Sequence, residues 1–321
     1  MAMSVQPLLV GVDVSKAELV ICLDPQQPPE VLPNQTKAIG QWFDSLPGAP
    51  LCLAVEATNT FHLALVEQAY QRGHTVYLVD GFRLNRYRES VGGRAKTDAS
   101  DARLLWRYLD RERADLRPWS PPAKGYAEVQ RLLHRRATLV KAKVTLTQSL
   151  REFTELKPTA DALFRQLAQL DRLIQNRLRR LIQQHQWADM VTRCQAIEGI
   201  GPLTAAALTM AFHRGDFRSS DAFIAFLGLD VRVRDSGKLR GRRRLTKQGD
   251  PELRRLLHLA AMQACRSASW QAFYQRYLDR GLSKIQALVI LARKLARVAF
   301  ALLKNNTSYQ PKCRQEGCMA T

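Results

Sequence analysis

Two carboxylates three residues apart stand in the run Lys-Thr-Asp-Ala-Ser-Asp-Ala-Arg at positions 96–103. Asp98 and Asp101 lie at the head of a predicted helix over 99–109, and their spacing places them on one helical face. Paired carboxylates on one face can bind a divalent cation. A helix N-terminus also favours negative charge, so Thr97 or Asp98 could simply cap the helix while Asp101 occupies its first turn. The run by itself leaves both interpretations open.

Two further acids lie upstream, within apolar runs typical of buried strands. Asp13 interrupts the run over 8–14, and Glu56 ends the run over 51–56. A carboxylate in a buried strand is unfavourable unless it is paired or bound to a cation. Together the four acids could hold Mg²⁺, and a pair of such ions can bind the attacking and leaving oxygens of phosphoryl transfer. The order of strand Asp, strand Glu and helix Asp-x-x-Asp resembles RNase H-like nucleases of the RuvC type.

The charge of the chain is unevenly distributed. The 321 residues carry a net charge of +20, and the pI of about 10.2 indicates a polyanionic partner. Residues 1–120 contain 13 Lys/Arg and 14 Asp/Glu, whereas residues 121–321 contain 36 and 15. We therefore expect the first part to supply the acidic site and the second part to attract nucleic acid.

The cysteines and the hydropathy pattern predict a protein of a reducing cytoplasm. Cys313 and Cys318 have no nearby His or Cys that would complete a zinc site. The other four read as small buried apolar residues: Cys22, Cys52, Cys194 and Cys265. No disulfide framework, signal peptide or apolar run of about 18 residues is present, so no membrane partner is expected.

Alternating strand and helix patterns over 8–118 predict an α/β domain with a partly parallel central sheet. The apolar patterns predict a hairpin over 8–24, helices over 36–46 and 60–72, and strands over 51–56 and 74–80. Four prolines between Pro25 and Pro33 indicate a loop there. Further prolines end the domain and predict a linker: Pro118, Pro121 and Pro122.

Apolar residues at threes and fours predict a helical hairpin or coiled coil over 124–187, broken at Pro158. The hairpin could form a dimer contact or pack only on its own chain. Its many arginines and lysines could likewise touch nucleic acid or form a solvated face.

The segment Gly199-Ile-Gly201-Pro202 resembles the turn of a helix–hairpin–helix element, in which backbone N–H groups approach a phosphate at the second helix. A plain tight turn without a phosphate is the alternative. This segment belongs to a predicted, mainly helical domain over 190–305, with helices over 222–227, 253–262 and 284–303, followed by a mobile tail over 306–321.

A basic loop follows the short helix over 222–227. Residues 232–255 contain ten Lys/Arg and three acids, and Ser236 lies inside the loop. Nearby cations and a polarised phosphate could activate this serine as a nucleophile, although Ser-Gly in a loop is also a common turn. With Gly199 and Gly201, the candidate nucleic-acid contacts are Arg232, Arg234, Lys238, Arg240, Arg242, Arg243, Arg244 and Lys247.

The motifs together resemble the 110 family of insertion-sequence transposases, relatives of the Piv-type DNA invertases. The matching segments run in order from about residue 8 to 303: Gly11-Val-Asp13-Val-Ser-Lys16, Val55-Glu56-Ala57-Thr58, Lys96-Thr-Asp98-Ala-Ser-Asp101-Ala102, Ile197-Glu-Gly199-Ile-Gly201-Pro-Leu-Thr204, Gly228-Leu, Ser236-Gly237 and Thr246-Lys-Gln-Gly249. The family usually has Gly where this sequence has Asn59, and Asn tolerates a left-handed turn.

The resemblance implies a RuvC-like domain whose Asp13, Glu56, Asp98 and Asp101 bind Mg²⁺, and a transposase domain with Ser236 as nucleophile. It further implies recombination of donor and target DNA selected by a structured non-coding guide RNA, the bridge RNA. The protein would act as a dimer of dimers, through a covalent phosphoserine link. Two alternatives remain: a RuvC-like hydrolytic nuclease or Holliday-junction resolvase, and a non-catalytic nucleic-acid-binding protein.

Overall fold

The chain divides into two units between Pro121 and Pro122, each with its own hydrophobic core. The computed structural model describes residues 7–92, 97–233, 235–236, 239–241 and 243–311, and for 235, 236, 239 and 240 it describes the backbone. Residues of interest outside this part are Lys96, Arg234, Gly237, Lys238, Arg242, Cys313 and Cys318.

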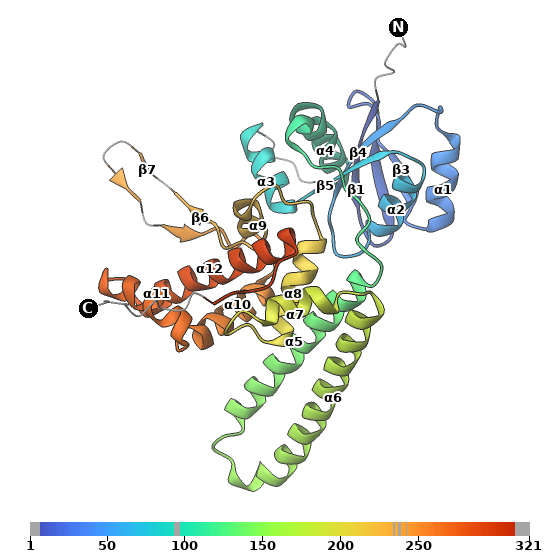
Figure 1. Cartoon of the computed structure of the whole chain (residues 1–321). Helices are drawn as coiled ribbons and strands as arrows, with labels where there is room; N and C mark the ends of the chain where they lie inside the picture. The colour runs from blue at the N-terminus through green and yellow to red at the C-terminus, as the bar shows by residue number, and fades with distance from the viewer. Residues whose placement is uncertain (1–6, 93–96, 234, 237–238, 242, 312–321) are drawn as a thin grey trace, which may run out of the picture. The chain divides into compact units, whose positions relative to one another are not determined.

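A five-stranded mixed sheet forms the centre of the first unit, with strand order β3-β2-β1-β4-β5 (Figure 1). β1 (Leu8–Val14) pairs antiparallel with β2 (Glu18–Cys22), which pairs antiparallel with β3 (Glu30–Pro33). On the other side of β1, β4 (Leu51–Glu56) and β5 (Thr75–Val79) continue the sheet in parallel. The central strands β1 and β4 are almost entirely buried, as their continuous apolar runs require.

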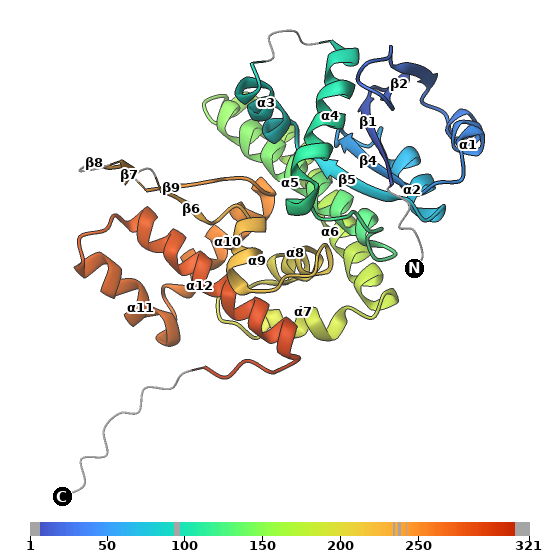
Figure 2. The same ribbon diagram turned by 90° about the horizontal axis from the view of Figure 1, so that it is seen from above.

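Helices cover both faces of this sheet (Figures 1 and 2). α1 (Thr36–Ser45) and α2 (Leu63–Gln71) pack on one face through a core that includes Val10 and Val12. α3 (Gly81–Ser90) and α4 (Asp98–Glu112) pack on the other face, and a 3₁₀ turn, Arg113–Asp115, follows α4. Because side chains alternate along a strand, Gly11 and Asp13 point toward the face that α3 and α4 cover.

Two sequence predictions for this unit are wrong. The proline-rich stretch 25–33 is not entirely loop, because Glu30–Pro33 forms β3 at the edge of the sheet, where proline is tolerated. The helix α3 was not predicted, since it has few apolar residues and buries only Leu84 and Arg88. Asn59, where the family usually has Gly, takes the left-handed conformation that Asn tolerates, with φ of 47°.

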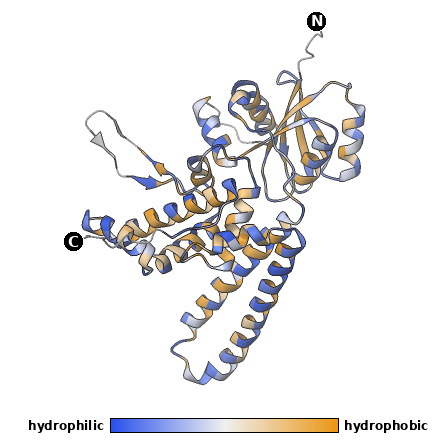
Figure 3. Ribbon diagram, viewed as in Figure 1, coloured by the Kyte–Doolittle hydropathy of each residue, from blue (hydrophilic) through white to orange (hydrophobic). Residues whose placement is uncertain are grey.

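The second unit begins with a long helical hairpin, formed by α5 (Tyr126–Ser149) and α6 (Lys157–Gln184). The break between them includes a 3₁₀ turn, Thr154–Leu156, and lies before Pro158, which occupies the first turn of α6 instead of interrupting a helix. Both helices alternate between orange and blue along their length in Figure 3, as expected of amphipathic helices.

Six further α-helices build the rest of the second unit within the described residues. The helix over 268–279 was not predicted from the sequence. The six are α7 (Ala188–Gln195), α8 (Pro202–His213), α9 (Ser220–Phe226), α10 (Pro251–Ala264), α11 (Ala268–Asp279) and α12 (Lys284–Asn305). The C-terminal part of α6 packs on the same core.

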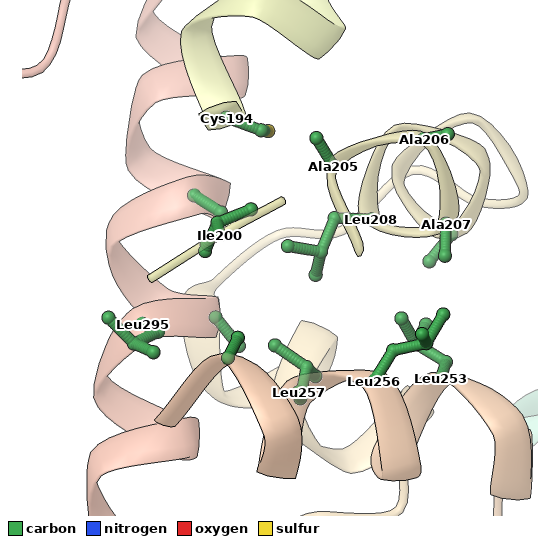
Figure 4. Packing of buried hydrophobic residues seen from close by; sticks show 14 of the residues in the cluster. Cys194, Ile200, Ala205, Ala206, Ala207, Leu208, Leu253, Leu256, Leu257 and Leu295 are labelled. Atoms are coloured by element: carbon green, nitrogen blue, oxygen red, sulfur yellow. The ribbon is translucent and has the colours of Figure 1, made fainter. Parts of the chain in front are cut away.

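The core of the second unit is packed from small and branched side chains. Cys194 of α7, Leu208 of α8, Leu257 of α10 and Leu295 of α12 are fully buried and converge in Figure 4. Cys194 is thus the small buried apolar residue that the sequence predicted. Tyr309, at the start of the predicted tail over 306–321, packs against this core.

The sequence predicted a plain loop for the basic stretch between α9 and α10. The structure instead has two short antiparallel strand pairs there. β6 (Val231–Arg232) pairs with β9 (Arg244–Leu245), and β7 (Asp235–Ser236) pairs with β8 (Leu239–Arg240). We call residues 230–246 the ribbon.

Candidate active site

Gly11 allows helix α4 to cross strand β1 at very short range. A Cβ atom at this position would lie 2.1 Å from the carbonyl oxygen of Ala102 and 2.4 Å from the backbone nitrogen of Trp106. Only glycine permits this approach. Asp13 lies two residues further along β1 on the same face, so the crossing brings its carboxylate beside the first turns of α4.

Strand pairing brings Glu56 next to Asp13. The parallel register sets Gly11 beside Ala54 and Val12 beside Val55, so Asp13 and Glu56 follow at the carboxyl ends of adjacent strands. Glu56 points toward the same face, because a Cβ atom on Gly81, the first residue of α3, would lie 2.5 Å from Glu56 Oε1. The carboxyl ends of parallel strands are a common place for functional groups in α/β proteins.

A capping box fixes the start of α4. The Thr97 side chain accepts a hydrogen bond from the Ser100 backbone N–H at 3.2 Å, and Ser100 Oγ accepts one from the Thr97 N–H at 2.9 Å. Thr97 is therefore the cap, and Asp98 is not needed for this role. Asp98 is exposed in the first turn, whereas Asp101 is only 6% exposed and faces the sheet.

The electrostatics of Asp13 link the four carboxylates. Burial and, in decreasing order, the negative charges of Asp101, Asp98 and Glu56 together raise the pKa of Asp13 to about 6. Carboxylates that repel one another in this way are costly without a cation, and such perturbed groups gather at functional sites.

Arg88 of α3 is a member of this site that sequence reasoning missed. Its Nη2 donates to Asp101 Oδ1 at 2.5 Å, and both side chains are about nine-tenths buried. The Ser100 hydroxyl donates to the same oxygen at 3.3 Å. The sequence could have indicated its burial, because Arg88 lies four residues after Leu84 and the two therefore share one face of α3, which is buried.

The four carboxylates fit a hard divalent cation by kind but not by their present arrangement. They supply only oxygen ligands, as Mg²⁺ prefers. Among the residues that the structure describes, however, no three His, Cys, Asp or Glu side chains are placed to hold a metal ion. In addition, the guanidinium of Arg88 occupies one oxygen of Asp101.

Ser236 lies in the ribbon of the second unit. Its backbone is in β7, opposite Leu239 of β8. At the base of the ribbon, Arg232 of β6 is opposite Arg244 of β9, and the Thr246 hydroxyl bonds to Asp230. The serine therefore stands on a hairpin-like extension between α9 and α10.

The predicted basic contacts differ in how far the structure describes them. Arg232 is half-buried, whereas Arg243, Arg244 and Lys247 are exposed, and Arg240 lies in β8. Lys247 has a left-handed backbone, with φ of 57°, and lines a hollow of about 320 Å³. Arg254, Arg255 and His258, which the sequence did not single out, line the same hollow.

The two glycines of the predicted phosphate-binding turn have different surroundings. Gly199 has φ of 89°, and a Cβ atom there would lie 2.5 Å from the Ala260 carbonyl oxygen, so packing against α10 accounts for this glycine. Gly201 is exposed at the N-cap of α8, with nothing within 4 Å of a built Cβ atom. Of the two predicted contacts, Gly201 has the more open surroundings.

Comparison with known proteins identifies the family of the chain. Residues 191–277 match the profile described as transposase IS116/IS110/IS902 family, and residues 10–158 match a DEDD-type profile described as transposase. A probable family 20 transposase of Pseudomonas aeruginosa is 30% identical over 314 residues, which cover 85% of this chain and 89% of the relative. The chain belongs to the IS116/IS110/IS902 family of transposases.

A pilin gene-inverting protein of Moraxella bovis is also similar, with 27% identity over 278 residues that cover 83% of this chain and 84% of the relative. Membership of the family makes this transposase an enzyme of DNA recombination, with DNA as its substrate. A DEDD-type domain also indicates a general need for a divalent metal. None of the described helices is both long and apolar enough to span a membrane.

Proposed function

We propose that this transposase exchanges strands between donor and target DNA through attack by Ser236, assisted by Mg²⁺ at the four carboxylates, with a structured guide RNA selecting both DNAs. One observation supports the metal site above all others: the charges of Glu56, Asp98 and Asp101 all act on Asp13. We assign the first unit to the RuvC-like fold, and its strand order β3-β2-β1-β4-β5 supports this assignment.

Asp13, Glu56, Asp98 and Asp101 would hold the metal, which would stabilise the negative charge that develops on the phosphate. Asp13, held by β1, and Asp101, held by α4, would orient the ion because their elements are fixed by the core.

The serine would act as the nucleophile. Ser236 Oγ attacks the phosphorus of a DNA phosphodiester, the bond from phosphorus to one deoxyribose oxygen breaks, and that oxygen leaves as a hydroxyl after it takes a proton. The strand then remains joined to the protein through a phosphoserine. Exposed Arg243 and Arg244 on the ribbon would offset the charge of the phosphate.

The net charge of the second part of the chain suits DNA and RNA backbones, and exposed Gly201 at the start of α8 suits a helix–hairpin–helix phosphate contact. We divide the chain into the RuvC-like domain over 8–118, the hairpin over 124–187 and the transposase domain over 190–305, acting at the bacterial nucleoid.

Exposed apolar residues on the hairpin support assembly into dimers and a dimer of dimers. Leu170 and Leu173 of α6 are 47% and 57% exposed, and Val144 of α5 is 49% exposed. Such residues on long helices are typical of a helix–helix contact with a second chain.

The covalent intermediate provides the test. The transposase is incubated with its co-purified RNA, DNA substrate and Mg²⁺, and the products are separated under denaturing conditions. We expect a protein–DNA adduct with the wild type and with the exposed control Ser308→Ala, and none with Ser236→Ala. An adduct that survives Ser236→Ala contradicts the serine assignment. Free DNA ends without any adduct would favour the hydrolytic nuclease instead.

A further inference from the structure

We propose that Arg88 occupies the metal-binding oxygen of Asp101 in the resting transposase, so that the site binds its divalent cation fully only after a DNA phosphate draws the guanidinium away. This inference rests on the proposed function of the four carboxylates. It assigns to Arg88 the role of a positioning residue that couples metal binding to the presence of DNA.

The geometry of the pair makes it a strong and specific contact. Arg88 Nη2 lies 2.5 Å from Asp101 Oδ1, with side chains that are 11% and 9% exposed. The other terminal nitrogen, Nη1, donates to Asn85 Oδ1 at 3.2 Å, which steadies the guanidinium from the same helix. Asp101 Oδ1 thus accepts hydrogen bonds from Arg88 and Ser100. The neighbouring carboxylates of this site repel one another.

A guanidinium and a divalent cation compete for such an oxygen. Arginine keeps its positive charge at all working pH values, so it cannot yield the carboxylate by losing a proton. A metal ion bound to Asp101 would also stand close to the guanidinium, and like charges repel strongly in a half-buried site. While Arg88 holds Oδ1, a metal ion can reach only the other carboxylate oxygen of Asp101 and stands close to the guanidinium, so each cation weakens the contact of the other.

A DNA phosphate offers Arg88 an alternative partner. Guanidinium groups bind phosphate oxygens as readily as carboxylate oxygens. If a phosphate enters beside the carboxylates, Arg88 can exchange Asp101 for the phosphate and leave the carboxylate to the metal. Metal binding and DNA binding then favour one another, and this coupling acts equally in both directions.

The coupling is measured by titration of the full chain with Mn²⁺, followed by competition with Mg²⁺, with and without a short mixed-sequence DNA oligonucleotide. In the wild type we expect the oligonucleotide to tighten Mn²⁺ binding at least about tenfold. In Arg88→Gln we expect Mn²⁺ to bind at least about tenfold more tightly than in the wild type without DNA, and the oligonucleotide to add little.

Arg86→Gln is the matched control. Arg86 lies on the same helix, is exposed and stacks over the Phe82 ring, so its removal changes the net charge equally without touching Asp101. This variant should bind Mn²⁺ as the wild type does. An equal gain in Arg86→Gln and Arg88→Gln would mean that net charge alone sets the affinity, which overturns the role of Arg88.

Removal of one partner of a buried ion pair can prevent folding. Arg88→Lys retains the charge on a shorter side chain with one nitrogen, and we expect it to fold and to bind Mn²⁺ with intermediate affinity. Binding no tighter than the wild type in both Arg88 variants would overturn the inference, because Arg88 would then serve only to stabilise or orient Asp101. The proposed metal site itself fails in a different way: no variant would bind Mn²⁺, even with DNA.

Discussion

The carboxylates of the first unit stand on elements that a buried core fixes, whereas Ser236 of the second unit stands on a ribbon of strand pairs only two residues long. β1 and α4 approach so closely at Gly11 that Asp13 and Asp101 cannot drift apart. The ribbon instead projects from the helices, with exposed arginines beside its short pairs.

We attribute this difference to the two kinds of chemistry that we propose for the carboxylates and for Ser236. Carboxylates that bind a metal repel one another. The strands and helices that carry them must therefore be held together by packing in the hydrophobic core. A nucleophile that must reach a phosphate on a large nucleic-acid partner needs access and freedom to move, which short strand pairs provide. The four predictions that follow test this contrast, from the largest expected effect to the smallest.

Gly11→Val should have the largest effect. The added side chain would enter backbone atoms of Ala102 and Trp106, which cannot yield as a flexible side chain could. We expect a loss of about 4 kcal/mol or more in the free energy of unfolding of the first unit. Chemical denaturation followed by tryptophan fluorescence measures it. The control Gly48→Ala adds a methyl group in open space and should change stability by less than about 0.5 kcal/mol.

Asp13→Asn should stabilise the metal-free protein while it abolishes DNA cleavage. The pKa of Asp13 is about 6 in the folded state and 3.8 as its ordinary value, so the folded state holds the proton more tightly. Stability therefore falls as the pH rises from about 4 to 6, and the full penalty applies above pH 6. After allowance for solvent screening, we expect Asp13→Asn to gain about 1 kcal/mol at pH 7 to 8.

Thermal unfolding at several pH values checks this gain, which should vanish below about pH 3.8, where Asp13 is protonated in both states. By contrast, Ser236→Ala should leave the unfolding temperature unchanged at every pH. A gain that does not depend on pH would show that repulsion among the carboxylates is not its cause.

Thr246→Val should loosen the ribbon without disturbing the carboxylates. The substitution removes the hydroxyl that bonds to Asp230 at the ribbon base, a loss worth about 1 kcal/mol. Hydrogen exchange should become faster at the amides of 231–232 and 244–245 and stay unchanged in β1 and β4. Equal exchange in the ribbon of both proteins would show that other contacts hold its base.

Leu173→Ser should have the smallest effect on the isolated chain. Leu173 is 57% exposed, so we expect a change of less than about 0.5 kcal/mol in stability but weaker self-association. Analytical ultracentrifugation measures the association. The control Leu178→Ser, at a residue 2% exposed on the same helix, should cost about 3 kcal/mol or more. Unchanged association would argue against the hairpin as a contact between chains.

The sequence predicted much of the first unit because its local patterns agree with its packing. The apolar runs of β1 and β4, the helix that begins after Thr97 and the left-handed turn at Asn59 all appear where expected. It failed where context decides: β3 forms despite its proline because it lies at a sheet edge, and α3 forms on a largely polar sequence because Leu84 packs on the sheet.

The amino-acid sequence by itself determined which chemistry the transposase can perform, because residue type fixes what a carboxylate, a hydroxyl or a guanidinium can bind. It also determined the strands and helices that carry Asp13, Glu56, Asp98 and Asp101, since hydrophobic periodicity is local. Only the tertiary structure decided that Gly11 brings α4 onto β1 and that Arg88 reaches Asp101. Contacts between elements distant along the chain depend on how their surfaces fit, which no local pattern encodes.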